Sequence, residues 1–400
     1  MARILITLAG RLVRGPDGHV YAPTPTLALP FWTRYRAVFD EVGVACRLMP
    51  ADTVPASMLR ADGDGVSFHD LPAFVGPWQY VAARRRVIEI LRDVLDGYDA
   101  YCLRVPCWIG TLAYSELRRR CKVFGIEVVG DPWDSLAPGA VKSLTRPFVR
   151  RSARRELRRQ CRDACAASYV TKEALQRSYP PGPGTFVTHY SSIDLGSEAF
   201  AEAPRTECSN AHRLIFVGTL EVLYKGQDVL IQALAQCQRA DIKLSVVGDG
   251  RCREDLRSLA KSLGLAHRIE FTGMLPSSQD VRAALDNADL FVLPSRQEGL
   301  PRAMIEAMAR GLPCIGSTVG GILELLPAED TVEAGDVAGL ARKIAEYLGD
   351  AERMARSSAR NLQTARQYHA DILNDRRRSF LHQLRRRSET AAIEEWECPS

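Results

Sequence analysis

The sequence predicts an α/β protein with two domains, each built from a parallel sheet whose strands alternate with helices. A length of 400 residues allows two separate cores. A composition of 46% hydrophobic and 25% charged residues is typical of a soluble globular protein. Short apolar runs also recur between segments of helical length. We therefore expect two doubly wound, Rossmann-like domains that face a cleft, with ligands at the carboxyl ends of the strands.

The first half of the chain contains six predicted strands separated by helical or loop segments. These strands are the runs at Arg3–Leu8, Val44–Met49, Ala100–Arg104, Ile126–Gly130, Ser168–Thr171 and Thr185–Thr188. A segment of small and acidic residues, Gly196–Arg205, follows them and is predicted to be the hinge. Residues 1–205 are accordingly assigned to the first domain.

The second half alternates more regularly between strand and helix. Its predicted strands are Arg213–Val217, Lys243–Val247, Arg268–Phe271, Leu290–Leu293 and Cys314–Gly316. Its predicted helices lie near 226–238, 252–263, 279–287, 301–310 and 336–348. A helical pattern then continues from Leu348 to about Arg387, before a poorly ordered tail at about 389–400. This pattern gives a second domain at 206–370 and a C-terminal helix and tail at 371–400.

Positive charge is concentrated in the first half, where residues 1–205 hold 28 basic and 21 acidic side chains against 25 and 27 in residues 206–400. Segment 142–162 alone has nine basic residues and one acidic residue. A helix beginning at Pro147 would carry a broad arginine face, which could lie against anionic lipid head groups. The alternatives are a solvated helix that packs on its own domain and a nucleic-acid site. No nucleic acid is expected, because no stacking aromatic residues accompany the arginines.

The sequence lacks the features of a secreted or membrane-spanning protein. It contains no run of eighteen apolar residues, and its first residues do not have the pattern of a secretory signal. Its eleven cysteines form no zinc-binding spacing. We expect a cytoplasmic protein with reduced thiols and no metal, attached peripherally to the inner face of the cytoplasmic membrane if the basic helix binds lipid.

Two carboxylates stand eight positions apart within Gln297–Pro313. On one continuous helix, eight steps of about 100° would leave Glu298 and Glu306 roughly 80° apart. Pro301 suits a helix start and Gly311 suits a stop, so the helix is predicted to begin between the two acids. Glu298 then lies on a loop and Glu306 on the helix. The free N–H groups at the helix start would bind a diphosphate or a sugar oxygen.

This stretch resembles the E-x7-E signature of glycosyltransferase family 4, the retaining GT-B enzymes. The family's other motifs are present in order, at Phe216–Leu220, Tyr224–Gly226, Val246–Gly250, Phe271–Gly273 and Gly320–Leu325. The resemblance covers roughly residues 213–349. It implies a GT-B fold whose last helix crosses back to the N-terminal domain. It also implies a metal-independent transfer of a hexose from a nucleotide diphosphate sugar to a lipid-linked, glycolipid or polysaccharide acceptor, with no cofactor.

The resemblance also assigns roles to residues of the second half. Glu298 and Lys225 are expected to be catalytic, with Glu298 beside the transferred sugar and Lys225 beside the departing diphosphate. Glu306 is expected to bind the ribose hydroxyls. The other expected donor-binding residues are Gly299, Leu300, Pro301, Arg302, Gly218, Thr219, Gly248, Met274 and Leu275. Many family members carry arginine where this chain has Thr219, so Arg302 or Arg296 is expected to supply the second phosphate cation.

The first half gives fewer candidates. Gly10 after the first strand, Arg104 at a strand end and Asp131 before a proline are expected on the acceptor side. His189 is interpreted as structural. Two other functions remain open at this point: a nucleotide-sugar epimerase of GT-B architecture, and a non-catalytic membrane-binding protein on the same scaffold.

Overall fold

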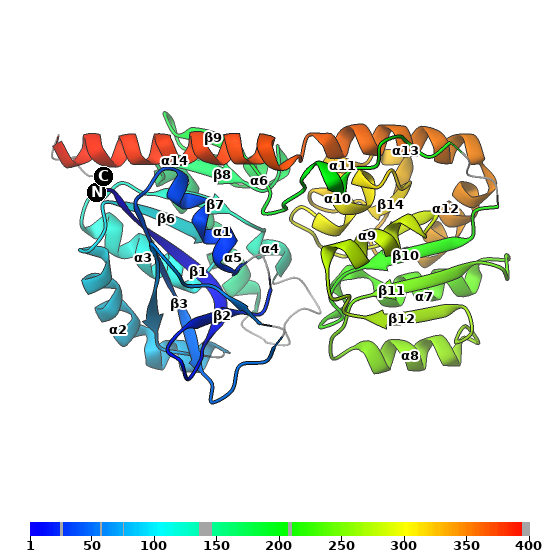
Figure 1. The fold of residues 1–400 in the computed structure, drawn as a ribbon, viewed down its shortest axis with the longest axis horizontal. Helices are drawn as coiled ribbons and strands as arrows, with labels where there is room; N and C mark the ends of the chain where they lie inside the picture. The colour runs from blue at the N-terminus through cyan, green and yellow to red at the C-terminus, as the bar shows by residue number, and fades with distance from the viewer. Residues whose placement is uncertain (25–26, 57, 75, 136–145, 207–209, 394–400) are drawn as a thin grey trace. The chain divides into compact units, whose positions relative to one another are not determined.

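The computed structural model describes residues 1–24, 27–56, 58–74, 76–135, 146–206 and 210–393. The chain forms two compact units (Figure 1). Unit 1 comprises Met1–Ser192 together with Leu373–Ser400, and unit 2 comprises Ile193–Ile372. Each unit has its own parallel sheet, so the prediction of two Rossmann-like α/β domains is confirmed.

The parallel sheet of unit 1 has the order β5-β3-β1-β6-β7-β8-β9. Its strands are β1 (Arg3–Arg14), β3 (Glu41–Pro50), β5 (Val66–Leu71), β6 (Ala100–Val105), β7 (Gly125–Val128), β8 (Ala166–Tyr169) and β9 (Phe186–His189). Two short strands, β2 (Val20–Ala22) and β4 (Leu59–Arg60), add antiparallel pairs beside the end of β1. The first strand is longer than predicted, because a bulge between Thr7 and Arg11 lets it continue past Gly10.

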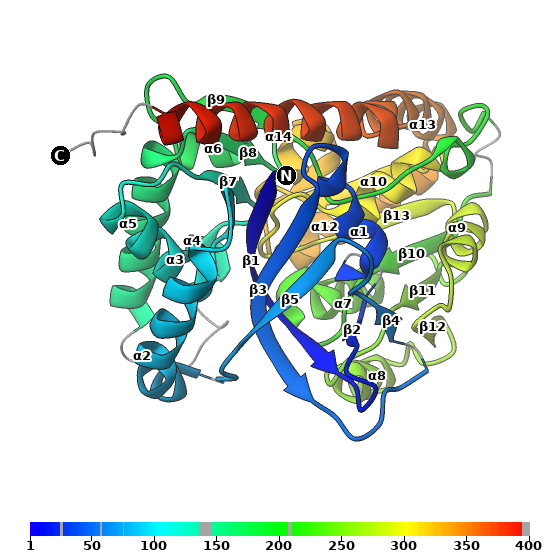
Figure 2. The same cartoon turned by 60° about the vertical axis from the view of Figure 1, so that its left-hand side comes forward.

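The helices of unit 1 cover its sheet. They are α1 (Leu29–Thr33), η2 (Tyr35–Ala37), α2 (Gly76–Leu95), α3 (Trp108–Arg119), α4 (Pro132–Ser135), α5 (Arg146–Asp163) and α6 (Ala174–Ser178). Helices α2 and α3 pack against each other (Figure 2). Their apolar stripes bury Leu91 and Leu117 in one core with Leu157 of α5. This core fixes the β6–α3 and β7–α4 turns at the carboxyl end of the sheet.

The last helix, α14 (Ala370–Ile393), packs on unit 1. Phe380 and Leu384 are fully buried, and the Phe380 ring lies 6.1 Å from that of Tyr190. Arg385 Nη1 donates to the carbonyl of Val38 at 2.8 Å. The crossing of the C-terminal helix to the N-terminal unit is therefore confirmed. The predicted tail is wrong for residues 389–393, which are helical, while residues 394–400 lie outside the described residues.

The stretch after Val337 forms three helices and not two. These are α12 (Val337–Gly349), α13 (Ala351–Arg366) and α14. The Asp350 side chain caps α13 by accepting from the N–H of Arg353 at 2.8 Å, so the chain restarts a helix directly after α12.

Unit 2 has a parallel sheet in the order β12-β11-β10-β13-β14-β15. Its strands are β10 (Arg213–Val217), β11 (Lys243–Val247), β12 (Ile269–Gly273), β13 (Leu290–Leu293), β14 (Cys314–Ser317) and β15 (Thr331–Val332). In chain order this is the Rossmann arrangement 3-2-1-4-5-6, whose strand order reverses between the first and fourth strands. The ligand position in such a sheet is the carboxyl end of β10 and β13.

The helices of unit 2 lie on both faces of this sheet (Figure 1). They include η3 (Ser197–Ala199), η4 (Leu223–Lys225), α7 (Gln227–Gln236), α8 (Arg253–Ser262), α9 (Ser278–Asp286), α10 (Arg302–Ala309), α11 (Ile322–Leu325) and η5 (Ala328–Asp330). Helix α7 packs with α8, and α9 packs with α10. The helix predicted at 301–310 is α10, with Pro301 just before its first residue as the N-cap.

The segment predicted to be a hinge, Gly196–Arg205, belongs to unit 2. Ala201 N–H donates to the carbonyl of Ala309 at 2.8 Å, and the Arg205 guanidinium donates to the carbonyl of Leu285 at 3.1 Å. These bonds hold the segment against α9 and α10. The boundary between the units therefore falls after Ser192, earlier than the predicted boundary after Arg205.

Candidate functional site

The loops at the carboxyl end of β10 and β13 hold the candidate site of unit 2. The loop after β10 carries Gly218, Thr219 and Lys225, and the loop after β13 carries Ser295 and Glu298. Because β10 and β13 are hydrogen-bonded neighbours, these two loops leave adjacent strands at the point where the strand order reverses.

Lys225 and Glu298 form an ion pair across this point. Lys225 Nζ lies 2.7 Å from Glu298 Oε1, and the two side chains are 14% and 8% exposed. Gly218 leaves room for the lysine, because a Cβ at Gly218 would lie 2.7 Å from the lysine Cδ. The two residues predicted to be catalytic are thus held together in a largely buried position.

Ser295, which the sequence analysis did not single out, adds a second donor to the same carboxylate oxygen. Its fully buried hydroxyl donates to Glu298 Oε1 at 2.8 Å. No hydrogen bond from the described residues reaches Glu298 Oε2. One oxygen of Glu298 is therefore occupied and the other is available to a ligand. The position of Ser295 three residues before Glu298 on a loop did not indicate this contact.

Glu306 lies on α10, as predicted, and its carboxylate is engaged by no hydrogen bond or ion pair within the described ranges. Burial raises the pKa of Glu306, and the positive charges of Arg302 and Arg282 oppose this rise. A half-buried carboxylate that accepts no hydrogen bond lowers the stability of the protein when no ligand is bound. It can accept from two neighbouring hydroxyl groups at once.

The turn at Gly320 and Gly321 supports the Glu298 loop. Gly320 has φ +47°, and a Cβ there would lie 1.9 Å from the carbonyl oxygen of Glu298. Gly321 N–H donates to the carbonyl of Gly299 at 2.7 Å. Both glycines belong to a motif that resembles the family's pattern, and in the structure they allow backbone contact with the Glu298 loop.

The remaining predicted donor-side residues surround these loops in different environments. Thr219 Oγ1 accepts from the N–H of Glu221 at 3.2 Å, and Gly248 N–H donates to the carbonyl of Gly273 at 2.9 Å. Met274 is 72% exposed, whereas Leu300 is buried. Of the others, Gly299 and Leu275 are half-buried, Pro301 is buried and Arg302 is exposed.

Arg296 is not free to replace the missing phosphate cation. Its guanidinium forms a bidentate pair with Asp228, with distances of 2.8 and 2.7 Å, and it also donates to the carbonyl of Leu223 at 2.6 Å. The expectation for Arg296 is therefore wrong as the structure stands, because the side chain fastens the two loops together. Arg302 stays a candidate.

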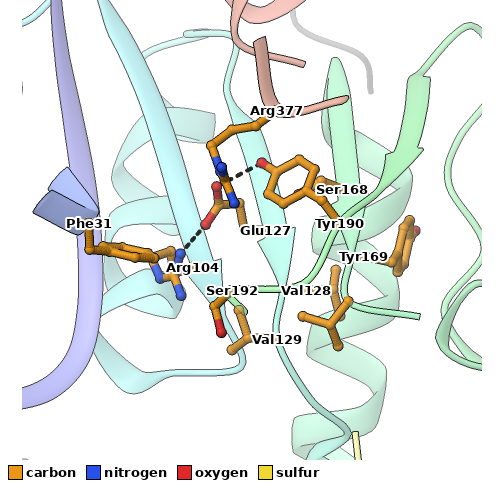
Figure 3. A pocket seen from close by; sticks show the side chains of 11 residues that line it. Phe31, Arg104, Glu127, Val128, Val129, Ser168, Tyr169, Tyr190, Ser192 and Arg377 are labelled. Atoms are coloured by element: carbon orange, nitrogen blue, oxygen red, sulfur yellow. Dashed lines mark hydrogen bonds and ion pairs between the residues drawn. The ribbon is translucent and has the colours of Figure 1, made fainter. Parts of the chain in front are cut away.

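In unit 1, the predicted acceptor residue Arg104 is bound to Glu127 in a nearly closed network (Figure 3). Glu127 Oε1 accepts from the hydroxyls of Tyr35 and Tyr190, each at 2.8 Å, and Arg104 Nη1 contacts Glu127 Oε2. Burial raises the pKa of both tyrosines, and the charge of Glu127 adds to this rise. Arg104 is therefore occupied structurally. Glu127 was not among the residues predicted from the sequence.

A small pocket adjoins this network at the carboxyl ends of β6, β7 and β8 (Figure 3). Its lining residues include Phe31, Arg104, Val129, Val170, Ser192 and Arg377. The other two acceptor candidates, Asp131 and Gly10, lie elsewhere in unit 1. Asp131 accepts from the N–H of Trp133 at 2.7 Å and from the hydroxyl of Tyr179, and Gly10 lies inside β1 and not after it. His189 bonds to Arg376, in agreement with a structural role.

The basic segment predicted at 142–162 is described from Arg146 onward as helix α5, and residues 142–145 lie outside the described residues. Leu157 and Cys161 are buried on one side. Arg150 lies over the Trp133 ring, with 3.7 Å between its Cζ and the ring centroid. Phe148 is 74% exposed. The arginines on the exposed side are Arg151, Arg155, Arg158, Arg159 and Arg162.

The described residues contain neither a cluster suited to a metal ion nor a helix suited to crossing a membrane. None of these residues forms a group of three or more His, Cys, Asp or Glu side chains that could hold a metal ion. Among the described helices, none has the length and apolar character needed to cross a membrane. Every cysteine within the described ranges is a free thiol.

The region that contains these loops matches a known protein family. Residues 211–350 match the family described as Glycosyl transferases group 1. Protein CapJ of Staphylococcus aureus is 24% identical over 322 residues, which cover 78% of each chain. The GDP-mannose-dependent monoacylated alpha-(1-6)-phosphatidylinositol monomannoside mannosyltransferase of Corynebacterium glutamicum is 33% identical over 218 residues, covering 48% of this chain and 55% of that protein.

Two solved structures share the whole fold. Sucrose-phosphate synthase from Thermosynechococcus elongatus has a TM-score of 0.71 at 16% identity, covering 96% of this chain and 99% of its own. Anabaena HepE in complex with UDP-glucose has a TM-score of 0.65 at 18% identity, covering 96% and 100%. The chain thus has the GT-B fold of glycosyltransferases. Residues 211–350 match the glycosyl transferases group 1 family, and the protein is a glycosyltransferase.

Proposed function

We propose that the protein is a retaining hexosyltransferase that uses a nucleotide diphosphate sugar and a lipid-linked, glycolipid or polysaccharide acceptor. The observation that carries this proposal is the convergence of Lys225 and Ser295 on one oxygen of Glu298, at the strand-order reversal of unit 2. Unit 2 would bind the donor and unit 1 the acceptor.

The chemistry of the proposal is the departure of a nucleoside diphosphate from the anomeric carbon. Lys225 and the N-terminus of α10 would stabilise the charge on the leaving diphosphate without a metal ion. The acceptor oxygen bonds to the anomeric carbon on the face that the diphosphate leaves, and its proton passes to the departing diphosphate oxygen, so the anomeric configuration is retained. The free oxygen of Glu298 would accept from a sugar hydroxyl and stabilise positive charge at the anomeric carbon.

Glu306 would hold the nucleotide through the two ribose hydroxyls. Its half-buried carboxylate, with no donor among the described residues, suits a group that brings two donors of its own. Arg302 at the start of the same helix would contact the diphosphate. HepE was solved with UDP-glucose, and the Corynebacterium relative is named for GDP-mannose, so both nucleotides are candidates for this chain.

The test is a panel of UDP-, GDP- and ADP-sugars. A true donor is expected to raise the melting temperature, because it binds the folded state. Transfer is then measured as release of nucleoside diphosphate with and without acceptor, and NMR of the donor alone detects an epimerase by a new sugar isomer. We expect transfer to persist in EDTA.

Two variants address the residues directly. Lys225→Ala and Glu306→Ala are each expected to abolish most transfer while circular dichroism shows an unchanged fold. Lys243→Ala is the matched control, because that exposed lysine begins β11 at the opposite end of the strand. Full activity in both site variants would refute the donor-site assignment.

We further propose that this enzyme acts in the cytoplasm and attaches to an anionic membrane surface through α5. The exposed ring of Phe148 would insert between lipids as an apolar anchor. The exposed side chains of Arg151 and Arg155 would supply positive charge on the same helix. Flotation with phosphatidylglycerol vesicles is expected for the native chain and not for Phe148→Ser with Arg151→Gln and Arg155→Gln. Arg85→Gln on α2 is the control. Equal flotation with neutral phosphatidylcholine would contradict the proposal.

A further inference from the structure

Two arginines stand side by side at the carboxyl end of the unit 1 sheet. Arg11 on β1 pairs in register with Arg47 on β3, in the part of β1 that follows the bulge. Residues paired in register on parallel strands project to the same face of a sheet. Ligands of doubly wound sheets bind at this carboxyl end.

Arg47 is fixed in place by its surroundings. Its Nη1 donates to the carbonyl of Phe74 at 2.9 Å, its Nη2 donates to the carbonyl of Ala9, and its Cζ lies 4.7 Å from the centroid of the Phe74 ring. Arg11 is exposed, and no hydrogen bond or ion pair within the described part of the chain engages its guanidinium. One cation is thus held rigidly and its neighbour is free to move.

The two positive charges have no acidic partner among the described residues. None of the ion pairs in those residues includes Arg11 or Arg47. Burial lowers the pKa of Arg47, and the charge of Arg11 lowers it further. The acid of the neighbouring strand, Asp70, pairs in register with Cys46 and not with Arg47. Like charges side by side are unfavourable, and a carboxylate or phosphate would relieve them.

A run of aromatic rings leads from Arg47 to an exposed tryptophan. Phe74, under Arg47, lies 5.4 Å from Tyr80, and Tyr80 lies 4.6 Å from Trp108, measured between ring centroids. Trp108 is the first residue of α3 and is 51% exposed. An exposed indole face can pack against the C–H face of a sugar ring. Two aromatic rings, Phe74 and Tyr80, therefore lie between the Arg47 guanidinium and the indole of Trp108.

We infer that Arg11, Arg47 and Trp108 form a subsite for an anionic glycan. The arginines bind a carboxylate or phosphate on one sugar, and Trp108 packs against another sugar of the same chain. This subsite would select the acceptor, and the inference rests on the proposed assignment of the acceptor to unit 1. It narrows the acceptor class to oligosaccharides that carry negative charge.

Ligand-observed NMR tests the subsite without donor or transfer. The probes are a hyaluronan tetrasaccharide, which carries carboxylates, its carboxyl-reduced neutral counterpart, and the pair glucose 6-phosphate and glucose. We expect each charged probe to bind at least tenfold more tightly than its neutral counterpart. Arg11→Gln is expected to remove that preference and Trp108→Ala to weaken only the tetrasaccharide. Arg85→Gln on α2 is the matched control.

Equal binding of charged and neutral probes, or an unchanged preference in Arg11→Gln, would overturn the inference. Arg11 is exposed, so Arg11→Gln is expected to fold, and it tests the subsite without a change to the more buried Arg47. The sugar-binding part would be rejected by two results together. Inorganic phosphate would displace the tetrasaccharide as effectively as glucose 6-phosphate does, and Trp108→Ala would leave tetrasaccharide binding unchanged. Nucleotide-sugar binding is measured separately in the same samples. Its loss would reject the proposed function, while the glycan-binding measurements would still test the subsite.

Discussion

Each unit contains a buried pair of a cation and a carboxylate near the carboxyl end of its sheet, and the two pairs differ in how fully the carboxylate is used. In unit 1, Glu127 is 3% exposed, and both of its oxygens have partners, Arg104 on one and two tyrosines on the other. In unit 2, both donors to Glu298 share a single oxygen.

Under the proposed function, this difference separates a structural pair in unit 1 from a functional pair in unit 2. Both oxygens of Glu127 already accept from protein donors, and the Arg104–Glu127 pair joins β6 to β7 and to the tyrosines. A carboxylate held by one oxygen is oriented and still able to accept. Burial and charge alone do not distinguish the two pairs, because each consists of one cation and one largely buried carboxylate.

The largest expected effect comes from Lys225→Ala. Loss of a cation aimed at a leaving diphosphate is expected to lower kcat by about 10²–10³-fold. The same change removes one partner of a buried pair, so the melting temperature should also fall, although Glu298 keeps its bond to Ser295. Steady-state kinetics measures the change in kcat, and thermal unfolding measures the change in melting temperature. A variant with native kcat would place Lys225 in the structural class with Arg104.

Glu127→Ala probes the other side of the comparison. Removing one partner of a buried pair leaves an uncompensated charge, so the free energy of unfolding should fall by about 3–5 kcal/mol. Glu173→Ala, which breaks the exposed Glu173–Arg177 pair, should cost under about 1 kcal/mol. Urea unfolding measures both. If both variants lose the same small amount, the unit 1 network is not the stabilising element that its geometry indicates.

Glu306→Gln connects stability with donor binding. Burial raises the pKa of Glu306 in the folded state, so its ionised form destabilises the fold above that pKa, and the penalty vanishes below the unfolded-state pKa. The glutamine variant should therefore melt higher than the native protein at neutral pH and equally at pH near 4. Donor affinity should fall about tenfold to a hundredfold. A lower melting temperature at neutral pH would contradict this sign.

Ser295→Ala gives the smallest expected change. One hydrogen bond to a carboxylate is lost while Lys225 remains, so kcat/KM should fall by roughly threefold to tenfold. The decrease should lie in kcat, since the bond of the serine to Glu298 orients that carboxylate. A change confined to KM would show that Ser295 acts in donor binding and not by orienting Glu298.

The sequence predicted unit 2 more accurately than unit 1 for physical reasons. Strands β10, β11 and β13 are short apolar runs with clear turns, and their predicted bounds match those observed. Strand β5 was missed because Ser67, His69 and Asp70 interrupt its apolar pattern. The bulge near Gly10 hid the second half of β1 in the same way, since a bulge shifts the alternation of faces.

The site was predicted in part. The division between Glu298 on a loop and Glu306 on a helix followed from Pro301 and helix geometry. The pairing of Arg104 with Glu127 did not, because it joins residues on two neighbouring parallel strands whose side chains share a face only once the sheet is formed. The engagement of Arg296 by Asp228 is likewise a tertiary contact between two loops.

The return of α14 to unit 1 affects the order in which the protein can be completed during synthesis. Unit 2 is one continuous segment, Ile193–Ile372, whereas unit 1 lacks a piece of its core until Leu373 and the residues after it have been made. Until then, the surface at Gly125 and Tyr190 that covers Phe380 and Leu384 is bare and apolar. The unit whose residues are synthesised first is therefore completed last, and truncation of the chain before Leu373 would remove part of the core of unit 1.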